Sequence, residues 1–183
     1  MNIISTPISD LYVIEPRVFK DDRGYFFEHY SEENFKNAGL NYKFVQDNES
    51  KSSYGVIRGL HYQLAPFAQT KLLRIIQGKI FDVAVDLRKN STTFGHWYGV
   101  EITEDNFLQL LIPRGFAHGF SVLSKIAIVH YKCDYIYNPS AEKGILYNDK
   151  SLNIDWHINP KDALVSPKDK ILPDFDKAEM NFL

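Results

Sequence analysis

The sequence lacks most of the features that mark secreted, zinc-thiolate and membrane-spanning proteins. Cys133 is its one cysteine, which rules out an intrachain disulfide and a cysteine-based zinc site. No segment approaches the ~20 consecutive apolar residues that span a bilayer. The stretch MNIISTPISD at its start has neither the basic residues nor the apolar run of a signal peptide. We therefore expect a cytoplasmic protein.

The sequence also lacks a strong charge of either sign. Its 21 Lys and Arg residues nearly balance its 23 Asp and Glu residues, for a net charge of −2 at pH 7. General binders of nucleic acid or of anionic membranes usually carry a basic excess, so we expect neither as a partner. A small anionic ligand needs only a few local Arg and Lys side chains, so the net charge does not exclude this class of ligand.

Low-complexity tracts, internal repeats and linkers rich in Pro, Gly or Ser are missing as well, so we expect one domain over residues 1–183. Aromatic residues are abundant: 13 Phe, 11 Tyr and 2 Trp. Because aromatic and β-branched side chains suit pleated, half-buried surfaces, this composition favours β-structure.

Short extended segments separated by turns dominate the chain. One short helix is expected, with Ser31 as its N-cap and Gly39 at its end. So many regularly spaced strands indicate an all-β double-sheet barrel, or jelly roll, which the Pro-, Asp- and Lys-rich C-terminal stretch would wrap in short helical turns. The predicted strands are 11–19, 25–28 after a turn at 21–24, 42–48, 56–64, 71–77, 79–86, 97–102, 108–112, 119–123 and 127–137.

Polar residues on strands are the candidates for function, because small barrels carry their chemistry on inward-facing side chains. Strict alternation puts His61 on one face of its strand and Arg58 on the other. Gly59 predicts a bulge that lets both reach the interior. The polar strand residues are Arg58, His61, Gln63, Lys71, His118, His130, Tyr131 and Lys132.

A metal site is one hypothesis for such histidines. Metal-binding cupins, a jelly-roll class, use a His-x-His pair with a carboxylate and a third His after a Pro-x-Gly turn. Residues 113–118 supply the last element, ending in His118, but the pair would be His61 and Gln63. Glutamine is a poor transition-metal ligand, so we expect no catalytic metal.

Each of the other candidates has a plainer explanation when taken alone. His61 and Tyr131 could be packed core residues, and Lys71 a solvated strand end. Together, on strands otherwise fit for burial, they favour acid–base chemistry. A phenol with a pKa of ~10 can protonate a strongly basic enolate, and a lysine inside a barrel can polarise a carbonyl.

The segments around these residues resemble one known family in order and spacing. They are DDRGYFFE (21–28), FVQDN (44–48), RGLHYQ (58–63), KLLR (71–74), FDVAVDLR (81–88), TFGHW (93–97), IPRGFAHGF (112–120), YK (131–132), ND (148–149) and SPKD (166–169). Through them the chain resembles the dTDP-4-dehydrorhamnose 3,5-epimerases. The resemblance implies a cupin-like double-stranded β-helix, a homodimer, no metal and no cofactor. It also implies inversion of carbons 3 and 5 of a nucleoside diphosphate 4-keto-6-deoxy sugar, in deoxysugar biosynthesis.

The resemblance further implies roles for individual residues. His61 would be the base, supported by Asp169, and Tyr131 the opposing acid. Lys71, with Arg58 nearby, would stabilise the oxyanion on carbon 4. The stretch from Arg23 to Glu28 would come from the partner subunit. The substrate-binding residues would be Arg23, Arg58 and Lys168 for the diphosphate, Gln46 and Asn48 for the base, Phe26 as a stacking surface, and Glu28, Gln63, His118 and Glu142.

The resemblance specifies the chemistry more closely than the substrate. Glu49 and Lys51 stand where rhamnose-pathway members often have His and Arg, beside the predicted base pocket. We expect dTDP as the nucleotide. The alternatives are the same chemistry on another nucleotide sugar, such as a GDP-linked 4-keto heptose, or inversion of carbon 3 alone. A non-catalytic sugar-binding cupin is a further alternative, but it gives no reason for a base, an acid and a lysine to occur together.

Overall fold

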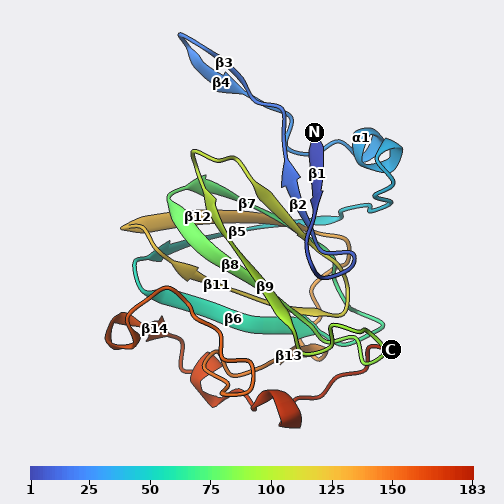
Figure 1. Cartoon of the computed structure of the whole chain (residues 1–183), viewed down its shortest axis with the longest axis vertical. Coiled ribbons are helices and arrows are strands. Elements are labelled where there is room, and N and C mark those ends of the chain that lie inside the picture. Colours follow the sequence, from blue (N-terminus) through green and yellow to red (C-terminus); the bar gives the residue numbers. More distant parts are fainter.

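The protein is built on two facing β-sheets (Figure 1), in a computed structural model that describes residues 1–183. One sheet has the order β1-β2-β10-β7-β12-β5 and the other β13-β6-β11-β8-β9, with β14 (Leu164–Val165) paired in parallel to β6. This is the predicted all-β jelly roll. The strands are β1 (Asn2–Ser5), β2 (Tyr12–Glu15), β5 (Gln46–Ser53), β6 (Val56–Gln63), β7 (Lys71–Gln77), β8 (Lys79–Asp86), β9 (Trp97–Thr103), β10 (Gln109–Ile112), β11 (Phe116–Val122), β12 (Ile126–Cys133) and β13 (Glu142–Gly144).

The helical segments lie where the sequence predicts them. Helix α1 (Glu32–Asn37) starts after Ser31, whose side chain accepts a hydrogen bond from the Asn34 backbone N–H, and Gly39 follows with a φ of +82°. In the C-terminal stretch, short 3-10 turns alternate with loops beneath β6 and β13 (Figure 1). No helix is long and apolar enough to cross a membrane. The 3-10 turns are η1 (Pro160–Asp162), η2 (Asp169–Ile171) and η3 (Phe175–Lys177).

Strand ends differ from prediction where tertiary partners begin or stop. The strand predicted over 127–137 ends at Cys133, because both neighbouring strands end opposite that residue. The strand predicted over 119–123 begins at Phe116, which pairs with the end of β8. The strand predicted over 11–19 stops at Glu15, before Pro16, which lacks the N–H that a ladder requires.

One further strand prediction was wrong in its start, and one strand of the first sheet was not predicted. The segment 42–48 enters the sheet only at Gln46, because Tyr42 and Phe44 pack with Tyr30 on the outer face instead. Strand β1 (Asn2–Ser5) was not predicted; it pairs with β2 at one edge of the first sheet.

Three apolar clusters hold the layers together. The first fills the interior between the sheets and includes Leu73 and Val129. The second lies between the outer face of the second sheet and the C-terminal stretch, where Trp156 packs near Leu60. The third packs Phe35 of α1 against the outer face of the first sheet. Burying a large apolar side chain stabilises by about 1.5–3 kcal/mol, so the second cluster fixes the C-terminal stretch against β6.

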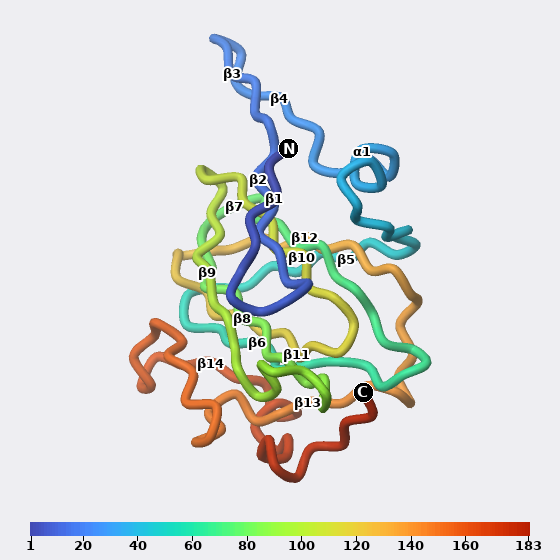
Figure 2. The backbone as a smooth tube through the Cα atoms, turned by 45° about the vertical axis from the view of Figure 1, so that its right-hand side comes forward, coloured from blue at the N-terminus to red at the C-terminus, as the bar shows by residue number.

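A hairpin stands outside this body. It consists of β3 (Phe19–Asp21) and β4 (Gly24–Phe26), joined by the turn predicted at 21–24. In two views it projects away from both sheets (Figures 1 and 2). Phe26 is 70% exposed, and the Arg23 side chain, 90% exposed, pairs only with Asp21 at 2.6 Å. Within one chain the hairpin therefore contributes nothing to the barrel interior.

Candidate active site

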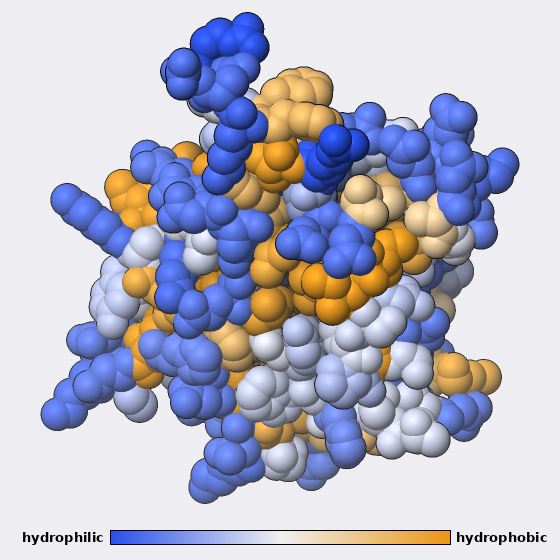
Figure 3. All heavy atoms as spheres, turned by 45° about the horizontal axis from the view of Figure 1, so that its top comes forward, coloured by the Kyte–Doolittle hydropathy of each residue, from blue (hydrophilic) through white to orange (hydrophobic).

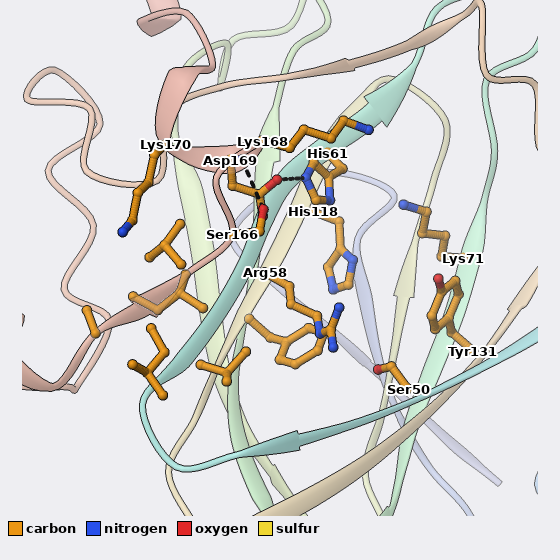
Figure 4. Close-up of a pocket in the computed structure, with 16 residues that line it drawn as sticks. Ser50, Arg58, His61, Lys71, His118, Tyr131, Ser166, Lys168, Asp169 and Lys170 are labelled. Carbon is orange, nitrogen blue, oxygen red and sulfur yellow. Dashed lines mark hydrogen bonds and ion pairs between the residues drawn. The ribbon is translucent and has the colours of Figure 1, made fainter.

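A cavity of about 590 Å³ lies in the barrel, closed on one side by residues 163–170. A second cavity of about 200 Å³ adjoins it. His61, Lys71 and Tyr131 line both cavities, so these side chains stand where the two spaces meet. Figure 4 shows the residues that line the larger cavity. They come from three strands, β6, β7 and β12.

The bulge predicted at Gly59 is present in β6. His61 lies opposite His118, and Arg58 lies opposite Phe120. An advance of three residues along β6 therefore matches an advance of two along β11, which is one extra residue in β6. Gly59 has a φ of +119°, and a Cβ added there would lie 2.5 Å from the Gly119 Cα, so only glycine fits. As a result Arg58 and His61 both line the larger cavity.

His61 is paired with a buried carboxylate. Its Nε2 lies 2.8 Å from Asp169 Oδ1, and the Gly59 backbone N–H donates to Oδ2 at 3.4 Å. Burial raises the pKa of Asp169, but hydrogen bonding and charge from His61, with the Gly59 N–H, outweigh it and hold that pKa below its ordinary value. An ionised Asp169 accepts a hydrogen bond from the Nε2–H of His61. This leaves the lone pair on Nδ1 of His61 free to act as a base.

Tyr131 and Lys71 form the opposite wall of the cavity (Figure 4). Burial raises the pKa of Tyr131, with Arg58 partly offsetting the effect. Burial lowers the pKa of Lys71, and Cys133, Asp82 and Glu142 partly offset it. Tyr131 therefore keeps its proton at neutral pH, while Lys71 loses its charge at a lower pH than an ordinary lysine does.

A second histidine–carboxylate pair lies between these walls. His118 lines the larger cavity, and its Nε2 lies 2.5 Å from Oδ1 of the fully buried Asp82. Asp82 was missed in the sequence, although a carboxylate in the middle of the apolar strand β8 is a signal that could have found it. Because Asp82 engages Nε2, Nδ1 is the ring nitrogen of His118 that is left for another partner.

Cations gather around the larger cavity. Arg58 and Lys168 line it as predicted, and Lys170, which was not predicted, lines it too. The Lys168 Nζ donates to Glu142 Oε2, which raises the pKa of Lys168. Burial raises the pKa of Glu142, but hydrogen bonds from Lys168 and Tyr137 outweigh it and hold that pKa below its ordinary value. An anion in this cavity would compete with Glu142 for Lys168.

Amide side chains gather on the smaller cavity. Gln46 and Asn48 line it, joined by a 3.1 Å hydrogen bond from Gln46 Nε2 to Asn48 Oδ1. Gln63 lines it too, but its amide donates to the Phe67 carbonyl and accepts from the Asn138 N–H. Gln63 therefore holds two loops together. No group of three His, Cys, Asp or Glu side chains is arranged to hold a metal ion.

Several predicted residues lie elsewhere in this chain. Arg23 and Phe26 are on the projecting hairpin, and Glu28 accepts a hydrogen bond from Asn34 at 2.6 Å. None of the three lines either cavity. Their predicted entry into the site from a partner subunit stays a prediction.

Alternation also places four residues on the outer face of the first sheet. His130 and Lys132 flank the inward Tyr131, so these two polar strand residues face away from the cavity; Lys132 pairs with Asp47 at 2.9 Å. Glu49 and Lys51 are exposed and alternate with inward residues of β5. The difference from rhamnose-pathway sequences therefore lies outside the pocket, not beside it as the sequence suggested.

The arrangement suits proton transfer on two faces of one molecule. A neutral imidazole on one wall can remove a proton from a carbon beside a carbonyl. A phenol on the other wall can return a proton from the opposite side. A lysine next to the phenol can stabilise the oxyanion that forms in between.

Comparison with known proteins relates the chain to sugar epimerases, whose reaction needs this kind of proton transfer. A family model described as dTDP-4-dehydrorhamnose 3,5-epimerase matches residues 5–177. The Shigella flexneri protein of that name is 52% identical over 170 residues, covering 92% of this chain and 93% of the relative. The crystal structure of the Elizabethkingia anophelis enzyme has 53% identity and a TM-score of 0.94, covering 98% and 99% of the two chains. The Legionella pneumophila epimerase in complex with dTDP-4-keto-L-rhamnose has 45% identity and a TM-score of 0.92, covering 96% and 93%.

Proposed function

This chain belongs to the dTDP-4-dehydrorhamnose 3,5-epimerase family, and from that premise we propose how its barrel performs the reaction. It is an isomerase that inverts carbons 3 and 5 of a dTDP-linked 4-keto-6-deoxy sugar. One observation supports the assignment of roles: His61 and Tyr131 line one cavity from opposite walls, with Lys71 beside the phenol.

The proposed reaction begins with the base. His61 Nδ1 takes the proton from a carbon next to the carbon-4 ketone, and the electron pair of that C–H bond moves to the carbonyl oxygen. The enolate oxygen receives a hydrogen bond from the charged Lys71, which stabilises it. Tyr131 then gives its proton to the same carbon from the other face, which inverts it. Exchange with solvent removes the proton from His61 and restores the one on Tyr131.

The two cavities suit the two ends of a nucleotide sugar. The larger cavity would hold the sugar between His61 and Tyr131, and its Arg58 and Lys168 supply fixed positive charge for the diphosphate. Gln46 and Asn48 supply the donors and acceptors that a nucleobase needs. Because Glu49 and Lys51 point away from both cavities, they give no reason to prefer another nucleotide over dTDP.

A homodimer is the second part of the proposal. The hairpin β3–β4 exposes Phe19 and Phe26, and apolar side chains gather on the face of the molecule from which it rises (Figure 3). A second copy of the chain would cover this surface and bring Arg23 to the site by symmetry. The free, buried Cys133 fits work in a reducing compartment such as the cytoplasm.

The direct test is incubation of the protein with dTDP- and GDP-linked 4-keto-6-deoxy sugars in deuterated water. We expect deuterium at carbons 3 and 5 of the dTDP sugar and faster turnover of it than of the GDP sugar. Deuterium at carbon 3 alone would favour the single-inversion alternative. Preference for the GDP sugar, or for a GDP-linked 4-keto heptose, would overturn the nucleotide assignment.

A further inference from the structure

Strand β5 carries an inward hydroxyl that the proposed reaction does not use. Ser50 lies in the wall of the larger cavity, and its Oγ is buried without a hydrogen-bond partner. Among the residues that line this cavity, Ser50 alone has such an atom. Buried polar groups are almost always hydrogen-bonded. The Oγ is covered in this rotamer, and rotation of the Ser50 side chain about its Cα–Cβ bond would turn the hydroxyl into the cavity, where a bound molecule would supply the missing partner.

Ser50 lies on the acid side of the cavity. In the antiparallel pair of β5 and β12, Ser50 is opposite Val129, and Asn48 is opposite Tyr131. Val129 and Tyr131 both face the interior, so Ser50 and Tyr131 are diagonal neighbours on one face. Figure 4 shows Ser50 below Tyr131, across the cavity from His61.

Ser52, on the same face of the strand, provides a matched comparison. It is buried, and its Oγ accepts a hydrogen bond from Arg58 Nε at 3.0 Å. Ser52 therefore positions the guanidinium that the proposed function assigns to the diphosphate. Ser50 has no such task within the protein.

We infer that Ser50 is a specificity residue whose hydroxyl binds the carbon-2 hydroxyl of the sugar. The inference rests on the proposed function, which puts the sugar of a nucleoside diphosphate sugar in this cavity. A 4-keto-6-deoxy hexose has ring hydroxyls on carbons 2 and 3, and a serine hydroxyl can donate to or accept from either. The carbon-3 hydroxyl changes face on inversion, whereas the carbon-2 hydroxyl does not. A fixed partner that serves substrate and product alike therefore fits carbon 2.

The test compares Ser50→Ala and Ser52→Ala with the wild type. Deuterium exchange at carbon 5 is measured with the full dTDP sugar and with its 2-deoxy and 3-deoxy analogues, and the affinity for dTDP alone is measured by calorimetry. We expect Ser50→Ala to lower kcat/KM roughly tenfold for the full sugar and the 3-deoxy analogue, as one lost hydrogen bond does. With the 2-deoxy analogue, we expect wild type and Ser50→Ala to have the same kcat/KM.

The controls separate this role from a structural one. Ser50→Ala keeps the wild-type affinity for dTDP and the wild-type Tm, because its Oγ binds nothing in the free protein, whereas Ser52→Ala weakens dTDP binding. Unchanged kcat/KM for the full sugar, or an equal loss with the 2-deoxy analogue, would overturn the inference. A loss that disappears with the 3-deoxy analogue instead would overturn the carbon-2 assignment. Absence of exchange in the wild type would overturn the proposed function itself.

Discussion

At the scale of single residues, the chemistry depends on how the barrel changes ordinary side chains. Asp169 is held ionised against His61, and Tyr131 is kept protonated by burial. Burial has the opposite effect on the charge of Lys71: it lowers the pKa of this lysine, although the proposed reaction needs its positive charge. We therefore expect the ionisation of Lys71 to set the upper pH limit of activity.

We predict the alkaline side of the pH profile from that shift. The charge of Lys71 is present below its lowered pKa and is lost as pH rises through it. Activity should therefore fall at a pH below the ~10.4 of an ordinary lysine. In Lys71→Arg the guanidinium stays charged, so the fall should move above ~10, where Tyr131 ionises. Steady-state kcat measured against pH checks this. An identical alkaline limb in both proteins would show that Lys71 does not set it.

The sequence predicted the polar strand residues that line the cavity, and its family resemblance predicted Asp169 as the partner of His61, but the sequence analysis missed Asp82 and Ser50. His61, Lys71 and Tyr131 stand out as polar residues on apolar strands. Asp82 and Ser50 also sit on strands, yet nothing in the order of residues shows that one holds His118 and the other has no partner. Those facts depend on which strands become neighbours.

At the scale of elements, most strands were predicted from two features, the alternation of residues between the two faces and the turn residues that separate the strands. Strands β7 and β8 have the predicted bounds, because each is an apolar run closed by a clear turn. The bulge at Gly59 was predicted because glycine interrupts a strand there. Strand ends were predicted less well, since β12 and β11 end or begin where their neighbours do.

The hairpin β3–β4 is the element whose role one chain does not explain, and it makes a prediction about subunits. If Arg23 completes the partner's site, Arg23→Ala and His61→Ala should each impair their own homodimers. Mixed and reassociated, they should form heterodimers with one intact site, which recovers about a quarter of wild-type activity by random pairing.

The matched control pairs His61→Ala with Lys71→Ala, two changes in the same pocket. Because neither chain of that heterodimer has an intact pocket, no activity should return. If the mixture with Arg23→Ala also stays inactive although heterodimers are present, the hairpin does not complete the partner's site.

At the scale of the whole molecule, the fold brings His61 and Tyr131, the proposed base and acid, to opposite walls of one cavity. The facing sheets provide the distance between the walls, and the C-terminal stretch delivers Asp169 to His61 through contacts that no strand pattern predicts. The central claim is that each group works on its own face of the substrate.

The measurement that tests this claim most directly is exchange and inversion followed together in deuterated water. For His61→Ala we predict that exchange at carbons 3 and 5 falls by at least ~10²-fold. For Tyr131→Phe we predict that His61 still exchanges the proton on its own face, while inversion is lost. Wild-type exchange in His61→Ala, or inversion undiminished in Tyr131→Phe, would contradict the account.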